Sequence, residues 1–305
     1  MINPEPLWDW AGKRHAAYIR QAIRRNEEVF SDNVGAGQRF SLIDPIIESY
    51  RFCNVFRELD RVTRWVDKSI RQPFRQHPNL WFMLAIARTI NWPDTLQDLM
   101  GHQRTWPFGD SFDPSAMMVA MQRRKDAGHK LYTGAYMVRA ESGRTAPWFN
   151  ESKQYYVAHI VLGRLWEDRF EWQRFLDSKP TVQEVHKRFM EYHGWGSFMA
   201  YQVCVDMMHT RYLFNAPDKN SWAALGLGST RGLNRLAGRP VKFKLSQEQG
   251  LAEMLSIYET QAMYRPLHVP HVPLSDIQNC LCETDKYLRV KNGEGRPRSY
   301  YHPTE

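Results

Sequence analysis

The stretch 193–200, His-Gly-Trp-Gly-Ser-Phe-Met-Ala, separates two segments with helical periodicity and decides the expected fold. Two glycines that flank one apolar residue, followed by a small residue, are typical of a helix-hairpin-helix. Such a hairpin presents the free backbone N–H groups of a helix's first turn to a nucleic-acid phosphate. A tight turn between two helices with a glycine cap is the common alternative. We predict a helix-hairpin-helix-like segment over residues 193–213, with Gly194, Gly196 and Ser197 at the DNA backbone.

Helical signals continue in both directions from this hairpin. Asp44 and Pro45 suit the cap and the first position of a helix, and apolar residues at spacings of three and four predict one long amphipathic helix over 44–72. A capping box at Thr181 and Glu184 predicts another helix. That helix covers residues 182–192. The other helices expected after residue 72 are 114–124, 151–177, 196–213, 247–264 and 275–290.

Strand signals are weak by comparison. Residues 131–138 and 241–245 could pair as short or edge strands, and Gly134 weakens the first of them. The expected class is therefore mainly α, with the hairpin element and at most short strands. We expect residues 1–305 to form a single helical domain, because no linker, repeat or low-complexity tract divides the sequence.

The composition favours an anionic partner. The chain has 305 residues, with 41 Lys and Arg against 33 Asp and Glu, a net charge of +8 and a pI of about 9.3. Aromatic residues make up 13%, which leaves rings for stacking as well as for the core. No apolar run approaches the roughly 18 to 20 residues of a membrane span, and residues 1–15 lack the apolar stretch of a signal peptide. We expect a soluble intracellular protein without a membrane partner; its four cysteines match no zinc-ligand or disulfide pattern.

A glycine-rich stretch from Gly226 to Arg235 is the second motif. Its glycines, Gly228 among them, could expose backbone donors to a phosphate, and Arg231 and Arg235 could add guanidinium forks. The sequence contains no G-x-x-x-x-G-K-[ST] pattern. A kinase site of the Walker A type is therefore excluded for this chain.

Acidic residues in helical contexts form the third set of candidates. Glu283 and Lys286 share a helix face at a spacing of three, either as an exposed ion pair or as site residues. Asp206 lies inside the apolar run 204–208. It is either a structural group with a buried partner or a functional group with a shifted pKa, and the residue pattern leaves both alternatives open.

Five stretches of the chain resemble one known family in the right order. They are residues 50–63, 130–137, 194–206, 226–235 and 281–287. Together they resemble the α-glutamyl/putrescinyl thymine pyrophosphorylase family of phage amino acid:DNA transferases. The same helical module occurs in phage 5-hydroxymethyl-deoxyuridine DNA kinases, where it is joined to a P-loop kinase domain. The lack of a Walker A site fits the transferase.

The resemblance implies a helical DNA-glycosylase-like fold and a step in thymine hypermodification. The family's substrate is double-stranded viral DNA in which a kinase has converted 5-hydroxymethyluracil to a pyrophosphate ester, and an amino acid or polyamine displaces the pyrophosphate. This implies action in the host cytoplasm, a functional link to that kinase, and protection of viral DNA from host restriction. By spacing, Asp218 lies nearer than Asp206 to the aspartate that follows the hairpin in the glycosylases.

The implied reaction makes three demands on the site. A base that is flipped out of the stack needs amides to read its edge and rings to stack on; the candidates are Asn54, Gln202 and Asn234, with Tyr136, Phe198 or Tyr201. The pyrophosphate needs fixed cations; the candidates, besides Gly228, are Arg57, Arg61, Arg231, Arg235 and Lys286. The amine needs a general base; the candidates in order are Asp60, Asp206 and Glu283, the last with Lys286 beside it. A magnesium ion carried by the pyrophosphate would leave no motif, and no other cofactor is expected.

Two other functions fit the same residues. A DNA glycosylase would use a similar hairpin and an aspartate, although no Lys follows the hairpin where bifunctional glycosylases place a nucleophile. A non-catalytic module that presents modified DNA to a kinase or synthase would need the hairpin but no general base. These two alternatives stay open at the level of the sequence.

Overall fold

The chain folds into helices that form two compact units. The computed structural model describes residues 2–32, 43–133, 150–295 and 297, and no β-strand occurs within these ranges. The mainly α class is therefore confirmed. Unit 1 comprises Met1–Asp60 and Asn220–Glu305, and unit 2 comprises Arg61–Lys219. Unit 2 is thus inserted into unit 1 along the chain. The single domain expected over residues 1–305 stays a prediction.

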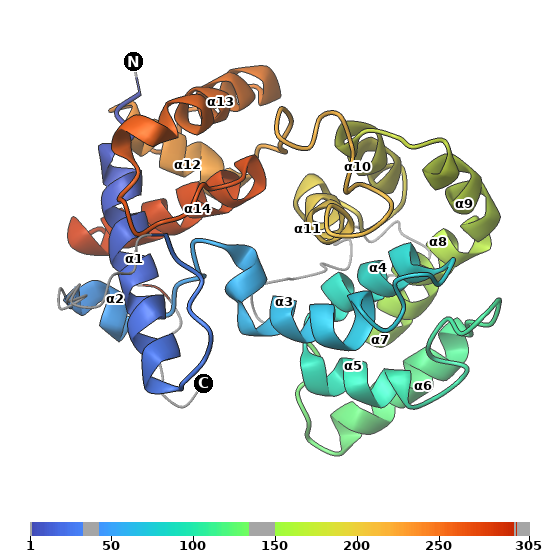
Figure 1. The fold of residues 1–305 in the computed structure, drawn as a ribbon. Coiled ribbons are helices and arrows are strands. Elements are labelled where there is room, and N and C mark those ends of the chain that lie inside the picture. The colour runs from blue at the N-terminus through green and yellow to red at the C-terminus, as the bar shows by residue number, and fades with distance from the viewer. Residues whose placement is uncertain (1, 33–42, 134–149, 296, 298–305) are drawn as a thin grey trace. The chain divides into compact units, whose positions relative to one another are not determined.

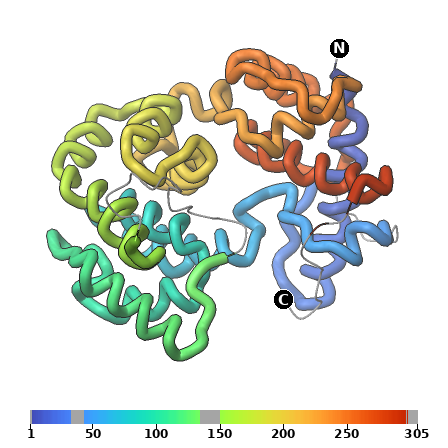
Figure 2. Tube along the Cα trace, turned by 180° about the vertical axis from the view of Figure 1, so that it is seen from behind, coloured from blue at the N-terminus to red at the C-terminus, as the bar shows by residue number. Residues whose placement is uncertain are grey.

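Unit 1 is built from both ends of the chain. Its elements are α1 (Glu5–Arg24), α2 (Pro45–Ser49), the 3₁₀ turn η1 (Arg57–Leu59), α12 (Leu227–Leu236), α13 (Gln247–Tyr264) and α14 (Leu274–Lys291). The central helix is α14, because α1, α2, α12 and α13 all pack against it. Figures 1 and 2 show the first and last helices of the chain, α1 and α14, lying against each other. Leu274, Ile277 and Leu281 of α14 are fully buried.

Unit 2 surrounds a helix without a polar face. Its elements are α3 (Arg61–Val66), the π-helical turn η2 (Asp67–Arg71), α4 (Leu80–Ile90), α5 (Pro93–Met100), α6 (Pro114–Asp126), α7 (Lys153–Tyr155), the π-helix η3 (Tyr156–Gly163), α8 (Arg164–Glu167), α9 (Arg169–Asp177), α10 (Val182–Met190) and α11 (Ser197–Met207). All eleven residues of α4 are buried. A helix that is buried on every side forms the core of its unit, and α5, α11 and η3 pack against α4.

Several expected helices are present at the predicted positions. The capping box of α10 is formed, since Glu184 N–H donates to Thr181 Oγ1 at 3.1 Å and Thr181 N–H donates to Glu184 Oε2 at 2.7 Å. The bounds of α6, α13 and α14 agree with the predicted ranges to within two residues. The sequence prediction did not include α1, α4 and α5.

The long helix expected over 44–72 is wrong. Asp44 does cap a helix, α2, but that helix ends at Ser49, and residues 50–56 are not helical. Their backbone groups bond instead to side chains of α14: Cys53 N–H donates to Glu283 Oε2 at 3.0 Å. Tertiary partners therefore outcompete the local helix, although Phe52, Val55 and Phe56 keep the burial that the spacing predicted.

Three further corrections concern local structure. The helix expected over 151–177 is divided into several elements. Its η3 part has π geometry, and the helix is interrupted at Asp168, between α8 and α9. The stretch 241–245 is a loop, since the carbonyls of Val241 and Phe243 accept hydrogen bonds from Asn234 Nδ2 at 3.2 and 2.9 Å. The glycine-rich stretch 226–235 is not a loop but the helix α12. Of the strand expected over 131–138, the part from residue 134 lies outside the described residues.

Candidate functional site

The first candidate site lies in unit 1, where residues 52–60 run across one face of α14. Glu283 holds the N–H of Cys53, and Asp276 Oδ1 accepts a hydrogen bond from the N–H of Arg57 at 3.2 Å. Residues seven apart lie on the same face of a helix, so both carboxylates point to the crossing segment. Asp60 is the last residue of that segment. We call Asp60, Asp276 and Glu283 the carboxylate cluster.

Glu283 is buried and forms an ion pair with Lys286. The distance between Glu283 Oε2 and Lys286 Nζ is 2.7 Å, and the same Nζ lies 4.7 Å from the centre of the Phe52 ring. Burial opposes the charge of Lys286, but the carboxylate of Glu283 outweighs it, and the pKa of Lys286 is raised. The predicted pairing of these two residues on one helix face is thus present, with the acid buried rather than exposed.

Asp60 is half-buried and accepts two hydrogen bonds from one residue. Its Oδ1 lies 2.8 Å from the backbone nitrogen of Asn54 and 3.1 Å from Nδ2 of Asn54. Burial raises the pKa of Asp60, although the bond from Asn54 and the charges of Arg14 and Arg57 act in the opposite direction. The amide of Asn54 therefore holds this carboxylate, and its predicted role in reading the edge of the base stays a prediction.

Asp276 is not among the site residues predicted from the sequence. It is buried, and burial raises its pKa to about 7 against the opposing effects of the Arg57 N–H and of the Arg57 charge. The signal that could have identified it is its spacing, because Asp276 and Glu283 are two acids seven residues apart on one helix. Nothing in the sequence identifies the strand-like segment that covers them.

These carboxylates interact with one another and with a buried cation. The charge of Asp60 contributes to the raised pKa of Asp276, and the charge of Glu283 contributes to that of Asp60. Arg57 is also buried in unit 1 and acts against both shifts. A carboxyl group whose pKa is raised toward neutrality can take up and release a proton at physiological pH, which is the requirement for general acid–base chemistry.

The predicted phosphate-binding arginines lie on α12, next to acids of unit 1. Asp285 forms ion pairs with Arg235 and Arg231, whose Nε atoms lie 2.6 and 3.1 Å from its carboxylate oxygens. Arg235 also forms an ion pair with Glu294 and is almost fully buried, whereas the Arg231 side chain is 39% exposed. Arg235 is thus committed to two acids, and Arg231 alone of this pair presents a large part of its surface to solvent.

The glycines of α12 allow the close approach of α14. A Cβ added to Gly228 would lie 2.3 Å from Sγ of Cys282, and one added to Gly232 would lie 2.3 Å from the carbonyl oxygen of Leu281. Gly228 therefore has a packing role, and it lies in the first turn of a helix rather than in the expected glycine loop. Its predicted contact with phosphate stays a prediction. Asn234 is buried, and its amide donates hydrogen bonds to two carbonyls of the loop that follows α12.

The second candidate site is the turn between α10 and α11 in unit 2. Gly194 has a φ of +83°, and a Cβ there would lie 2.5 Å from Cγ2 of Val161, so only glycine fits. Trp195 is buried and donates from Nε1 to the Val161 carbonyl at 3.0 Å. Gly196 precedes α11 without a side-chain cap, and a Cβ there would meet open space. This geometry suits an anion at the first turn of α11, where Ser197 begins the helix.

Two aspartates that follow the hairpin are held by structural partners. Asp206 is fully buried, and its Oδ2 and Oδ1 receive Nε and Nη2 of Arg88 at 2.5 and 2.6 Å. Asp218 accepts hydrogen bonds from the N–H groups of Val182 and Gln183 at 2.7 and 2.9 Å, so it caps α10. The structural alternative for Asp206 is therefore the one that the geometry favours.

The predicted site residues are distributed over both units. Unit 1 contains Asn54, Arg57, Asp60, Gly228, Arg231, Asn234, Arg235, Glu283 and Lys286. Unit 2 contains Arg61, Gly194, Gly196, Ser197, Phe198, Tyr201, Gln202 and Asp206. Of these, Arg61 is exposed, Gln202 and Tyr201 are buried in α11, and Phe198 is about half exposed. Tyr136 lies outside the described residues.

The described ranges show neither a metal-binding cluster nor a membrane-spanning helix. These contain no group of three or more His, Cys, Asp or Glu side chains placed to bind a metal ion. No helix in the described part of the chain combines the length and the apolar composition needed to cross a bilayer. The predicted magnesium ion, which the pyrophosphate itself would carry, stays a prediction.

The fold and the two sites define a helical protein with a cluster of buried and half-buried carboxylates and a glycine turn suited to phosphate. The family described as "5-hmdU DNA kinase, helical domain" matches residues 5–296, and the chain belongs to this family.

One relative is the "5-hmdU DNA kinase" of Bacillus phage SP10, which is 27% identical over 212 residues. The alignment covers 67% of this chain but only 31% of the relative, so the chain corresponds to about a third of that protein. No solved structure matches the chain.

Proposed function

We propose that the chain is a transferase that displaces pyrophosphate from 5-(pyrophosphoryloxymethyl)-deoxyuridine in phage DNA with the amine of an amino acid or polyamine. The observation that carries the proposal is the carboxylate cluster beside the buried Arg57. This cluster occurs in a member of a phage DNA kinase family whose sequence has no Walker A motif. A proton-transfer site without a phosphate-binding loop supports a step other than phosphorylation.

In the proposed step, the amine nitrogen bonds to the exocyclic methylene carbon of the base. The bond from that carbon to the pyrophosphate oxygen breaks, and pyrophosphate leaves with the bonding electrons. The nitrogen gives one proton to a carboxylate, which releases it to solvent. We assign this base to Asp60, because its pKa is raised and it is only half-buried, whereas Asp206 is enclosed with Arg88.

The cations of unit 1 have different roles in this proposal. Arg231 and Lys286 retain exposed surface and are assigned to the charge of the leaving pyrophosphate. Arg235 is a positioning residue, because it binds the same carboxylate, Asp285, that fixes Nε of Arg231. The turn at Gly194 and Gly196 in unit 2 is assigned to the DNA backbone.

The membership in the family of the 5-hmdU DNA kinase helical domain supports a proposal for the substrate and partners. A 5-hydroxymethyl-deoxyuridine DNA kinase would supply the phosphorylated base in double-stranded viral DNA, in the host cytoplasm, and the modified product would resist host restriction. Magnesium would enter with the pyrophosphate, whose oxygens suit this ion.

The direct test uses a duplex oligonucleotide that contains one pyrophosphorylated 5-hydroxymethyluracil. The purified chain is incubated with this duplex and a panel of amines that includes glycine, glutamate, serine and putrescine. We expect release of pyrophosphate and, by nucleoside mass spectrometry, a base heavier by the amine. The duplex with unphosphorylated 5-hydroxymethyluracil is the control. The absence of an adduct with every amine on verified substrate contradicts the proposal, and release of a free base would indicate a glycosylase instead.

A variant at the assigned base sharpens this test. Asp60→Asn keeps the oxygen that accepts from Asn54 but cannot take up a proton, so the transfer rate is expected to fall by a factor of roughly 10² to 10⁴ with DNA affinity unchanged. Glu259→Gln, at an exposed position of α13 in the same unit, is the matched control and should retain the rate. A full transfer rate for Asp60→Asn would remove Asp60 from the mechanism.

A second candidate function is a non-catalytic module that binds modified DNA. The observation that favours it is the coverage of the SP10 relative, in which the aligned part is 31% of a protein named as a kinase. Under this alternative, the chain prefers duplexes with 5-hydroxymethyluracil over thymine, and Asp60→Asn has no effect on any transfer by a complete set of proteins. Measured affinities for the two duplexes, together with the adduct assay, distinguish the two functions.

A further inference from the structure

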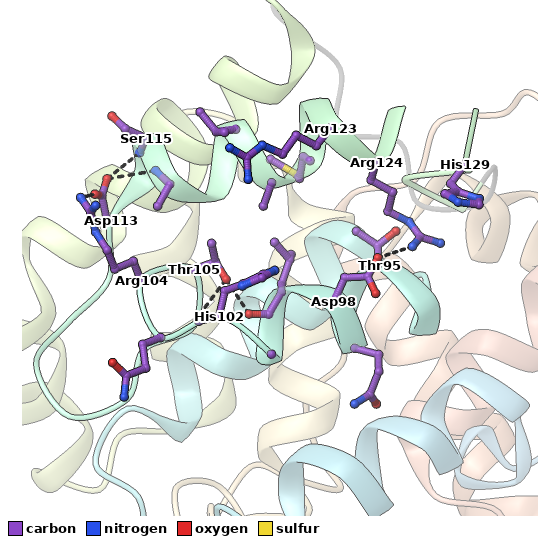
Figure 3. A pocket seen from close by; sticks show the side chains of 18 residues that line it. Thr95, Asp98, His102, Arg104, Thr105, Asp113, Ser115, Arg123, Arg124 and His129 are labelled. Carbon is purple, nitrogen blue, oxygen red and sulfur yellow. Dashed lines mark hydrogen bonds and ion pairs between the residues drawn. The ribbon is translucent and has the colours of Figure 1, made fainter. Parts of the chain in front are cut away.

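A groove in unit 2 lies apart from all the residues discussed so far. It runs between α5, the loop 101–113 and α6, and its volume is about 1320 Å³ (Figure 3). None of the predicted site residues lines it. The groove is therefore separate from the carboxylate cluster and the glycine turn of the proposed function.

The acidic residues of the groove are already paired with arginines. At one end Asp98 forms an ion pair with Arg124, and at the other end Asp113 forms one with Arg104 (Figure 3). Asp113 Oδ1 in addition accepts the N–H of Ser115 at 2.8 Å, as the cap of α6. Both acids are thus neutralised, and neither is available for a cationic ligand.

The polar side chains that remain unused around the groove include one cation. Within the described ranges, six polar lining side chains form no hydrogen bond or ion pair: Gln97, His102, Gln103, Ser115, Arg123 and His129. Arg123 is exposed at the groove and carries five N–H donors in a planar fork. A guanidinium of this kind binds phosphate through two parallel hydrogen bonds. The unused chemistry of the groove is therefore that of an anion site.

The α6 side of the groove carries apolar side chains, and we call this side the floor. Ala116, Val119 and Ala120 of α6 share one helix face with Arg123, and Leu99 of α5 lies opposite. From Ser115 to Arg123 the helix rises by about 12 Å, which is about the length of a nucleotide. Small side chains beside a guanidinium leave room for a planar ring, and the two glutamine amides at the rim can pair with the edge of a base.

We propose that this groove binds a nucleotide, with its phosphate on Arg123 and its base on the Ala116–Ala120 floor. A free nucleotide and a nucleotide within a single strand share this chemistry. The paired acids disfavour a bare polycationic or metal ligand, and the apolar floor distinguishes a nucleotide from inorganic phosphate.

The test is calorimetric titration of the full chain with dTMP, thymidine and inorganic phosphate. We expect saturable binding of dTMP, with thymidine and phosphate each bound at least about 10-fold more weakly, because each lacks one of the two contacts. The tetranucleotide of thymidine identifies the source: a gain of more than fourfold over dTMP indicates a strand, and a smaller gain indicates the free nucleotide. Absence of saturable dTMP binding, or phosphate binding as tight as dTMP, overturns the proposal.

Three variants locate the binding. Arg123→Ala should weaken dTMP binding by roughly 10- to 100-fold, because a charged hydrogen-bonding partner is lost. Ala120→Leu keeps every charge but fills the floor, and it should weaken dTMP binding while leaving phosphate binding unchanged. Lys125→Ala removes a cation of α6 that does not line the groove, and it should have no effect. Equal weakening by Lys125→Ala and Arg123→Ala would overturn the proposal, since it would indicate unspecific attraction to α6.

Discussion

Both units bury acidic side chains, but they do so in different ways. In unit 2, Asp206 has a zero exposed fraction and receives two nitrogens of Arg88, which is itself bonded to Thr63 Oγ1 at 3.1 Å and to Asn91 Oδ1 at 3.3 Å. In unit 1, Asp60 and Asp276 accept hydrogen bonds from neutral amides, and burial raises the pKa of each. The same residue type is therefore held as a salt bridge in one unit and as a proton-binding group in the other.

The difference shows which buried acid indicates function. A carboxylate that is matched by a guanidinium stays ionised and serves as a fixed structural charge. A carboxylate that is buried against uncharged donors has a raised pKa, which is a cost to stability and useful for chemistry. Burial alone does not separate the two cases; the partner does.

The largest effect is expected where the salt bridge of unit 2 is broken. Asp206→Ala leaves Arg88 buried without its carboxylate, which should lower the free energy of unfolding by about 3 to 5 kcal/mol. Urea unfolding followed by circular dichroism measures this loss. The double variant Arg88→Met, Asp206→Leu removes both charges and should recover most of the stability. A stable Asp206→Ala protein that has lost transfer activity would reverse the comparison and make Asp206 a functional acid.

The next effect concerns the pH dependence of unit 1. The pKa of Asp276 is about 7 in the folded chain against 3.8 for a free side chain, so between these values the folded state keeps a proton that the unfolded state has lost. The contribution of Asp276 to stability is therefore complete below about pH 4 and decreases by up to ~1.4 kcal/mol per pH unit as the pH rises to about 7. Asp276→Asn should remove this decrease.

The measurement compares urea unfolding of the wild type and Asp276→Asn at pH 5 and at pH 7.5. The difference between the two proteins should shift in favour of the variant at the higher pH. Glu259→Gln, which removes an exposed acid of the same unit, should leave the pH dependence of the wild type intact. Parallel pH dependence of wild type and Asp276→Asn would show that Asp276 is ionised in the folded state.

The sequence predicted the parts of the fold that depend on local interactions. The capping box at Thr181 and the range of α13 follow from neighbouring residues, and both are present. The helix expected over 44–72 failed because the N–H groups of Cys53 and Arg57 find partners on α14, more than 200 residues away. No local pattern contains that information.

The candidate site could be predicted only in part for the same reason. Glu283 and Lys286 were identifiable because their pairing is a property of one helix. Asp276 was not identifiable from the sequence, because its pKa is raised by burial under residues that are distant in the sequence. The glycines of α12 suggested a phosphate loop, but what they permit is contact with Cys282 and Leu281, which only the packed structure shows.

A smaller effect is expected from the contact between α12 and α14 that supports the cations of unit 1. Gly232→Ala places a Cβ 2.3 Å from a backbone oxygen of Leu281, so the helices must separate, and the free energy of unfolding should fall by roughly 1 to 3 kcal/mol. Thermal or urea unfolding measures the loss. Gly226→Ala, at the N-cap of α12, is the comparison, because its added Cβ comes no closer than 3.6 Å to Gln278 Nε2 and should cost less. Alanine has a higher helix propensity than glycine, so a loss at Gly232 reports the contact with α14. Equal losses for the two variants would contradict the close-packing explanation.

The smallest effect tests the remaining aspartate after the hairpin. Asp218→Ala removes the acceptor for the N–H groups of Val182 and Gln183, and the loss of a helix cap costs about 1 kcal/mol. Urea unfolding should detect this loss, with Glu191→Ala at the exposed end of α10 as the control that leaves these hydrogen bonds intact. If Asp218 is only a cap, the transfer rate per folded molecule stays unchanged. A fall in the transfer rate that the loss of stability does not explain would instead place Asp218, and not the carboxylate cluster, beside the reacting nucleobase, as in a glycosylase.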